Sequence, residues 1–195
     1  MNVLIVGPQG AGKGTQATRI AEEYDVPHVA TGDLFRAAIA AGTELGRAVE
    51  PLLASGQLVP DEVTIALIRE QLDAAEGGFV LDGFPRNLAQ AEALDAMLDE
   101  IERPLSIILL LELDDEVARG RLLERATLEG RADDTPDVID RRLATYHEQT
   151  EPIVGHYLAT GKLVKVHAER SIDEVWAEIS DALETVQSRW GQARA

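Results

Sequence analysis

Residues 2–16 read NVLIVGPQGAGKGTQ, an apolar run that passes through a glycine-rich turn to a lysine. The run at 2–7 is rich in Val and Ile and stops at glycine, which is typical of a buried strand. A helical pattern begins directly after the glycines and extends over residues 13–24. A strand buried on both of its faces needs helices on each side, so this stretch strongly constrains the fold of the whole chain.

The same alternation of strand and helix patterns continues to the end of the chain. Further strand patterns occupy residues 77–82, 105–113 and 162–168, and helical patterns occupy residues 87–101, 114–125, 136–158 and 171–186. The helix expected at 87–101 has one apolar face, formed by Leu88, Ala91, Leu94, Met97 and Leu98. Together these patterns indicate an α/β fold with a parallel sheet covered by helices.

Helix boundaries are marked by local signals. Pro136 suits the first turn of a helix, and Ser171 with Glu174 matches a capping box. Two regions break the alternation. Residues 31–60 look helical but supply no obvious strand, which suggests an insert, and residues 126–135 are polar and contain glycine, as in a mobile loop. A length of 195 residues suits one domain.

Composition excludes several classes of protein. The chain has no apolar run of the ~20 residues that a membrane span needs, and no signal-peptide pattern, so we expect a cytoplasmic protein. It has no cysteine, which excludes disulfides and thiolate metal sites. A net charge of −17 disfavours nucleic acid and anionic membranes as partners. All cations except Lys13, Lys162 and Lys165 are arginines, so arginine positions carry information about anion binding.

The glycine-rich turn fits the phosphate-loop pattern G-x-x-x-x-G-K-[ST] with one change, because Gly14 precedes Thr15. Glycines allow successive backbone N–H groups to surround phosphate oxygens, and the next helix adds a favourable dipole. A turn without ligand is the alternative, but the strand, lysine and helix together favour nucleotide binding. The residues expected to hold the ATP phosphates are Gly10, Ala11, Gly12, Lys13, Gly14 and Thr15. Since GTPases, ATPases and kinases all use such a loop, other motifs must identify the reaction.

Several separate motifs occur in the order found in one family. The segment GKGTQ at 12–16 resembles the adenylate kinase family of nucleoside monophosphate kinases. The segments TGDLFR, GQLVPD, DGFPR, GRADD and RRLATYHEQTEPI, at 31–36, 56–61, 82–86, 130–134 and 141–153, agree with it. The resemblance runs from residue 2 to about residue 186. It implies a P-loop NTPase fold of three α-β-α layers with a five-stranded parallel sheet. It also implies a helical AMP-binding insert at 30–59, a short lid at 126–134, and a monomer.

The resemblance assigns roles to most of the arginines. Arg36 and Arg86 would clamp the AMP phosphate, Arg125 would meet ATP, and Arg131 and Arg142 would meet the transferring phosphoryl group and AMP. Lys13, Arg86, Arg125, Arg131 and Arg142 form the expected catalytic set. Arg121 and Arg170 would lie near the ATP adenine, although relatives often have glycine or lysine where Arg170 stands. Considered without the resemblance, Arg36 could be a surface cation, and Glu124 and Glu129 could form surface ion pairs with some of the other arginines. Arg141, which is next to Asp140, has no role in any of the motifs.

The resemblance also implies a set of AMP-binding residues. Besides the arginines these are Thr31, Gln57, Leu58, Val59, Gly83, Phe84, Pro85 and Gln90. Thr31 and Gln90 favour AMP, because pyrimidine-preferring relatives tend to have alanine and asparagine there. The Gln90 carboxamide can both donate and accept at an adenine edge. Asn87 also looks like UMP/CMP kinases, which keeps a UMP/CMP kinase as the alternative.

The implied reaction is MgATP + AMP ⇌ 2 ADP, by in-line transfer without a covalent intermediate. Mg²⁺ would be held largely by waters oriented by Asp82 and by Thr15, although Asp82 could instead be structural. Both inserts would close over the nucleotides. No zinc is expected, because cysteines are lacking and the lid is short, and the histidines lack metal-ligand spacing. A nucleotide-dependent switch is the alternative outside metabolism. Relatives usually place proline where Gln9 stands, so the role of its side chain stays open.

Overall fold

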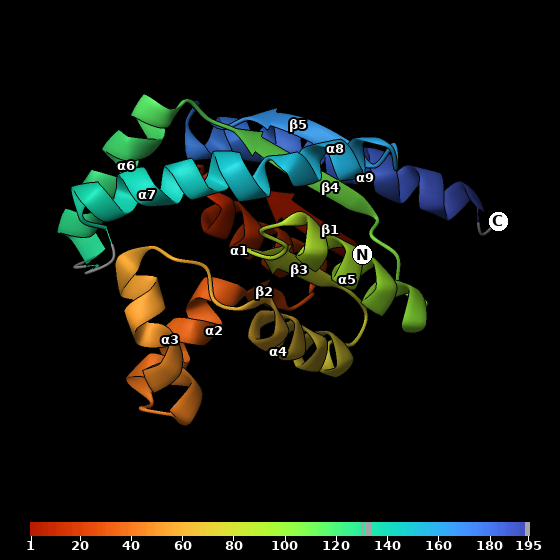
Figure 1. The fold of residues 1–195 in the computed structure, drawn as a ribbon. Coiled ribbons are helices and arrows are strands. Elements are labelled where there is room, and N and C mark those ends of the chain that lie inside the picture. Colours follow the sequence, from red (N-terminus) through yellow and green to blue (C-terminus); the bar gives the residue numbers. More distant parts are fainter. Residues whose placement is uncertain (130, 132–133, 194–195) are drawn as a thin grey trace.

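The computed structural model describes residues 1–129, 131 and 134–193. In that part of the chain five strands form one parallel sheet in the order β2-β3-β1-β4-β5 (Figure 1). The strands are β1 (Asn2–Val6), β2 (His28–Ala30), β3 (Phe79–Asp82), β4 (Ile107–Glu112) and β5 (Leu163–His167). The five-stranded parallel α/β fold expected from the sequence is therefore confirmed.

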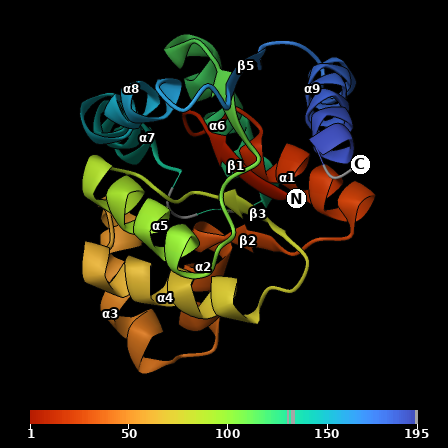
Figure 2. The same cartoon turned by 90° about the vertical axis from the view of Figure 1, so that its right-hand side faces the viewer.

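Helices cover both faces of this sheet. They are α1 (Lys13–Tyr24), α2 (Thr31–Ala40), α3 (Glu44–Ser55), α4 (Asp61–Ala74), α5 (Leu88–Glu100), α6 (Asp115–Glu129), α7 (Pro136–Thr145), α8 (Pro152–Leu158) and α9 (Ile172–Ala193). A π-helical turn, η1 (Tyr146–Thr150), lies between α7 and α8. In Figure 2, α1 and α9 lie on one side of the sheet, and α4, α5 and α8 on the other.

The period of two in β1 divides the core into two clusters. Val3 and Ile5 face one cluster, where Ile20 of α1 and Ile179 of α9 pack. Leu4 faces the other cluster, together with the apolar faces of α4, α5 and α8. All three β1 residues are at most 1 % exposed. Because side chains alternate across a strand, this double burial explains why β1 has no polar face.

Some elements differ from the sequence-based expectation. β2 and α4 were not predicted, and β2 is only three residues long, too short to produce a recognisable period. The expected helix at 136–158 is interrupted at η1, where the Glu151 N–H donates to the carbonyl of Tyr146. Pro152, the next residue, has no N–H with which to continue the α-helical ladder.

Other predicted details can be checked in the same way. Helix α6 continues to Glu129, so residues 126–129 are helical instead of forming a loop. Leu88 is 45 % exposed, so it does not join the buried face of α5. Pro136 begins α7 as predicted. The capping box is confirmed, since the Ser171 N–H donates to the Glu174 carboxylate and the Glu174 N–H to the Ser171 hydroxyl.

Helices α2 and α3 form a separate layer beside the sheet, below the carboxyl ends of the strands in Figure 1. They enclose a small apolar cluster of their own, built on Phe35, Val49 and Val59. On the other side of the carboxyl edge lie α6 and α7 (Figure 1). The strand ends therefore face a space flanked by two helical pairs. Among the described residues, no helix is both long enough and apolar enough to cross a membrane.

At Gly7, directly after β1, the chain lies close against β4. Its φ is +151°, and a Cβ there would lie 2.5 Å from the carbonyl oxygen of Leu111. We predict that Gly7→Ala destabilises the protein by about 3 kcal/mol, through backbone strain and displacement of β4. Urea unfolding would measure this. Gly155→Ala is the matched control, because a Cβ in this exposed turn of α8 meets nothing within 4 Å. It should stabilise the protein by up to about 1 kcal/mol, and equal effects of the two changes would contradict the prediction.

Candidate functional site

The loop between β1 and α1 has the backbone of an anion cradle. Gly10 and Gly12 have φ of +85° and +82°, a conformation that side chains disfavour. Gly12 is also the N-cap of α1, and it has no side chain with which to occupy the helix N-terminus. The first-turn N–H groups of α1 therefore face the space beyond the loop, where a phosphate would gain from the helix dipole.

Lys13 closes this loop on itself. Its Nζ donates to the carbonyl oxygens of Gly7 and Pro8, each at 2.8 Å. Burial lowers the pKa of Lys13 to about 8, although the nearby carboxylate of Asp82 acts in the opposite direction. The amine is thus a poorly solvated cation held over the loop, and an arriving phosphate would offset its lost hydration.

Asp82 ends β3 beside the loop, with its side chain 14 % exposed. Burial by itself would raise the pKa of Asp82, but His28 and the charges of Lys13 and Arg86 outweigh burial and lower it. The His28 Nε2 lies 3.8 Å from the Asp82 Oδ2, and a Cβ at Gly14 would lie 3.6 Å from the same oxygen. A carboxylate that favours its ionised form therefore stands next to the phosphate loop.

A cleft of about 500 Å³ lies over the loop. Its walls combine Lys13, Thr15 and Asp82 with arginines from several elements. These arginines are Arg36, Arg86, Arg121, Arg125, Arg131 and Arg142. The cations that the sequence disperses over more than a hundred positions thus meet at one place, despite the acidity of the chain.

A second, smaller pocket of about 60 Å³ shares part of this wall. Besides three arginines, it contains six of the residues expected around AMP, namely Thr31, Gln57, Leu58, Val59, Gly83 and Gln90. Four residues line both the cleft and the small pocket besides glycines, and these are Gln9, Arg36, Arg86 and Arg142. Three cations therefore stand where two separate ligands would meet.

One buried carboxylate, that of Asp134, holds two of the arginines of the cleft in place. Arg125 binds Asp134 with two hydrogen bonds, of 2.7 and 2.9 Å, and the Arg142 Nη1 donates to the same carboxylate at 2.9 Å. The Asp134 side chain is 0 % exposed. Residue 133 lies outside the described residues, and the role of Asp134 depends on contacts that no local pattern displays.

The remaining arginines have different partners. The Arg86 Nε donates to the Gly83 carbonyl at 2.7 Å, and burial, with the charge of Arg142, lowers the pKa of Arg86 to about 10. Arg36 forms an ion pair with Asp33 at 2.5 Å, and Arg131 pairs with Glu129 at 2.7 Å. The last pair is one of the surface pairs considered from the sequence.

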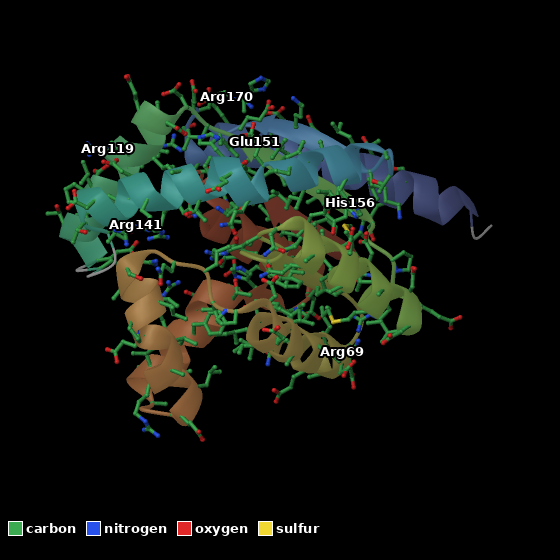
Figure 3. The ribbon with its side chains drawn as sticks, in the orientation of Figure 1. Arg69, Arg119, Arg141, Glu151, His156 and Arg170 are labelled. Carbon is green, nitrogen blue, oxygen red and sulfur yellow. The ribbon has the colours of Figure 1, made fainter. Side chains whose placement is uncertain are left out.

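Arg121 lines the cleft and also binds backbone carbonyls of the loop and of residues 168–169. Its Nη1 donates to the carbonyls of Ala168, at 2.8 Å, and Gly10, at 3.4 Å, and its Nη2 donates to that of Glu169. Arg170 lies apart from the cleft lining and pairs with Glu178 on α9. Figure 3 shows Arg170 at the top of the molecule.

Three of the expected binding residues have side chains that are buried or already hydrogen-bonded within the protein. Phe84 is 1 % exposed and packs in the core, so only its backbone could face a ligand. Ala11 is 3 % exposed, so it too could contact a ligand only through its backbone. The Gln90 Oε1 accepts from the Arg86 N–H, and its Nε2 donates to Asp61. Pro85 lines a third small pocket behind the loop with Tyr146. An adenine that used the Gln90 amide would share it with these partners.

Gln9 is the loop residue whose role the sequence left open. Its side chain borders both the cleft and the small pocket, and its Oε1 is buried without a hydrogen-bond partner among the described residues. Of the histidines, His28 faces Asp82, whereas His147 pairs with Asp115 and Glu151, away from the cleft. Within the part of the chain that the structure describes, no three metal-ligating side chains come together.

Comparisons with known proteins show what the whole chain is similar to. The model of a family described as adenylate kinase matches residues 5–162. An adenylate kinase of Synechococcus sp. (strain RCC307) is 50 % identical over 181 residues, which cover 93 % of this chain and 97 % of the relative. One of Thermobifida fusca is 48 % identical, over 95 % of this chain and 99 % of the relative. One of Xanthomonas euvesicatoria is 44 % identical, over 94 % and 99 %.

The depressed pKa of Lys13 makes triphosphate binding sensitive to pH. Phosphates stabilise the charged amine, so the pKa of Lys13 rises on binding, and affinity falls as pH rises through 8 in the free protein. We predict a loss of roughly tenfold in ATP affinity between pH 7 and pH 9, measured by calorimetry without divalent cations. Lys13→Met should bind more weakly and lose this dependence. An affinity of the unmodified protein that stays constant over this range would contradict the prediction.

Proposed function

The chain belongs to the adenylate kinase family, and we propose that the two adjoining pockets are its ATP and AMP sites. The protein is a phosphotransferase that moves a phosphoryl group from ATP to AMP. The observation that carries the site assignment is the shared wall. Arg36, Arg86 and Arg142 line both the cleft over the phosphate loop and the small pocket beside it.

ATP occupies the large cleft, with its phosphates on the loop from Gly10 to Thr15 and near Lys13. Arg121 lies at the outer end of this cleft, against the backbone of Gly10 and Ala168, where the adenine would extend. AMP occupies the small pocket, with its phosphate between Arg36 and Arg86. This arrangement directs the AMP phosphate toward the γ-phosphate of ATP, so positioning supplies much of the rate enhancement.

In the transfer step an oxygen of the AMP phosphate attacks the γ-phosphorus in line. The bond to the β–γ bridging oxygen breaks, and its electron pair leaves on the β-phosphate of ADP. Lys13, Arg125, Arg131 and Arg142 stabilise the charge on the equatorial oxygens. Both products are ADP, so the reverse reaction uses the same groups.

Asp134 positions two of these cations. It accepts from the Arg125 Nε and Nη2 and also from the Arg142 Nη1, so it holds helices α6 and α7 at a fixed spacing. Without such a counter-ion the two guanidinium groups would repel each other before any phosphate arrives. A fully buried carboxylate is suited to this, because water does not weaken its field.

The residues beside the loop fit a magnesium ion carried by ATP. Asp82 is an ionised carboxylate at the carboxyl end of β3, and Thr15 offers a hydroxyl on the same wall. Mg²⁺ prefers oxygen ligands and keeps several waters, so it needs no protein cage. Bound there, it would neutralise phosphate charge, while Asp82 orients its waters and Thr15 provides an oxygen ligand.

Residues 30–59 and 126–134 are proposed to close over AMP and ATP respectively, which keeps water from the γ-phosphate. Residues 130, 132 and 133 of the second segment lie outside the described residues. We also propose that the enzyme works as a cytoplasmic monomer on free nucleotides, in line with its lack of cysteines and its acidic surface.

The structure explains the one residue that pointed to a pyrimidine acceptor. Asn87 is the N-cap of α5, where its Oδ1 accepts from the Gln90 N–H and its Nδ2 donates to Asp61. This capping role accounts for asparagine without any nucleobase contact. The names of the relatives give no support to a UMP/CMP kinase either.

The acceptor assignment predicts a clear order of substrates. A coupled assay of ADP formation should give kcat/KM for AMP at least about tenfold above that for CMP or UMP, since pairing of a base edge discriminates strongly. The Thr31→Ala variant should reduce this ratio, because Thr31 lines the small pocket. A higher kcat/KM with CMP than with AMP would show that the acceptor assignment is wrong.

The shared arginine wall separates an enzyme from a nucleotide-dependent switch. We predict that Arg86→Ala lowers kcat for AMP phosphorylation by about 10³-fold, as loss of a phosphate-clamping cation in a buried site does, while ATP affinity changes little. Arg69→Ala is the matched control, because Arg69 is an exposed arginine whose partner is Glu100, away from both pockets. Near-normal turnover in Arg86→Ala would exclude the clamp.

A further inference from the structure

Arg141 joins α7 to a segment that the proposed mechanism sets in motion. It is exposed on α7, and its Nη1 donates to the backbone carbonyl of Ser55 at 2.7 Å. Ser55 is the last residue of α3, in the segment proposed to close over AMP. Figure 3 shows Arg141 on the side of α7 that faces α3. The sequence alone suggested only a surface cation next to Asp140, but Asp140 instead binds Arg119.

The carbonyl that Arg141 takes is one that α3 leaves without an intrahelical partner. Gly56, at φ +75°, ends the helix, and the N–H groups of Gly56 and Gln57 bind the carbonyls of Leu53 and Leu52. That pattern satisfies two of the last carbonyls and leaves the carbonyl of Ser55 facing outward. The last turn of α3 contains no basic residue of its own. Arg141 therefore supplies, from another helix, the cation that a helix C-terminus favours.

Close packing accompanies this hydrogen bond. A Cβ added to Gly56 would lie 3.1 Å from the Val138 Cγ1 and 3.1 Å from the Arg142 Cγ. The absence of a side chain at Gly56 thus allows the end of α3 to rest directly on α7. The residues that follow are Gln57, Leu58 and Val59, which line the small pocket. The contact therefore lies at the edge of the AMP site.

Arg141 and Arg142 are adjacent on α7 but contact different parts of the protein. Arg142 lines both pockets and binds Asp134, whereas Arg141 binds the end of α3. Because the two residues are adjacent, closing the insert onto Arg141 also places it against the helix that carries Arg142. Binding of AMP and placement of a transfer cation would then be linked through one helix.

We propose that Arg141 is a positioning residue for AMP, a latch that favours the closed position of residues 30–59 against α7. This rests on the proposed function, in which that segment closes over AMP. Without the latch the open state gains population, and AMP must then supply the free energy of closure that the hydrogen bond had provided. The ATP cleft does not include Arg141 and should retain its affinity.

Steady-state kinetics test the latch. Arg141→Ala should raise KM for AMP roughly fivefold, the loss of a single exposed charge-assisted hydrogen bond, with KM for ATP unchanged and kcat not reduced. Arg141→Lys keeps a long cationic side chain and should recover most of the AMP affinity. Arg69→Ala is the matched control, an exposed arginine that bridges α4 and α5, and it should leave both constants unchanged.

A distance measurement tests the same proposal without turnover. The chain has no cysteine, so Glu50→Cys on α3 and Glu148→Cys on η1, both exposed, give two specific sites for spin labels. In the nucleotide-free protein, Arg141→Ala should shift the distance distribution toward larger values, and AMP should restore the shorter one. Arg69→Ala in the same labelled background should leave the distribution unchanged.

Two results would overturn the latch. One is an unchanged KM for AMP in Arg141→Ala, or a KM for ATP that rises in the same proportion. The other is a distance distribution that the change does not affect. Failure of the proposed function would look different, because the unmodified protein would then form no ADP from ATP and AMP, whatever residue 141 is.

Discussion

Electrostatic repulsion within the site is the constraint on which the rest of this structure depends. Lys13 and the surrounding arginines line one cleft, in which we propose that they reach the same phosphates, and without nucleotide they repel one another. Asp134 offsets this repulsion between Arg125 and Arg142, and Asp82 does so near Lys13 and Arg86. Each carboxylate ends up buried, where its removal would leave uncompensated charge. In the proposed site the acidic side chains are therefore as necessary as the basic ones, because they hold the cations together before a phosphate binds.

The same constraint explains which cations are used. Burial lowers the pKa of the Lys13 amine to about 8. Guanidinium groups remain protonated even when burial lowers their pKa, as it lowers that of Arg86 to about 10. Their planar donors also allow Arg125 to hold Asp134 through two bonds at once. An acidic chain, whose surface repels anionic substrates in general, thus keeps a local region of positive potential over its phosphate loop.

Sequence reasoning reached the features that local patterns encode. The run at 2–7, the glycines and Lys13 predicted a strand, a loop and a helix, because burial and backbone freedom act over a few neighbouring residues. Spacing and resemblance also predicted which arginines would gather, and the structure places six of them on one cleft. What could not be predicted depends on partners distant in sequence. The pairing of Arg141 with Ser55 and the occupied amide of Gln90 follow from how helices pack. β2 has only three residues, too few to show a period of alternation. At η1 the Glu151 N–H binds the carbonyl of Tyr146, five residues earlier, and no local pattern marks this change of hydrogen bonding.

Gly56 has a consequence for how sequences of this kind can diverge. The missing side chain there leaves only the room that Val138 does not fill, so the size permitted at position 138 depends on glycine at position 56. The φ of +75° at Gly56 disfavours any side chain there whatever the space, so glycine is expected to persist in relatives, and position 138, which lies 82 positions later, is expected to hold nothing larger than valine. Position 55 is under no such restriction from Arg141, because the guanidinium recognises a carbonyl that every amino acid carries.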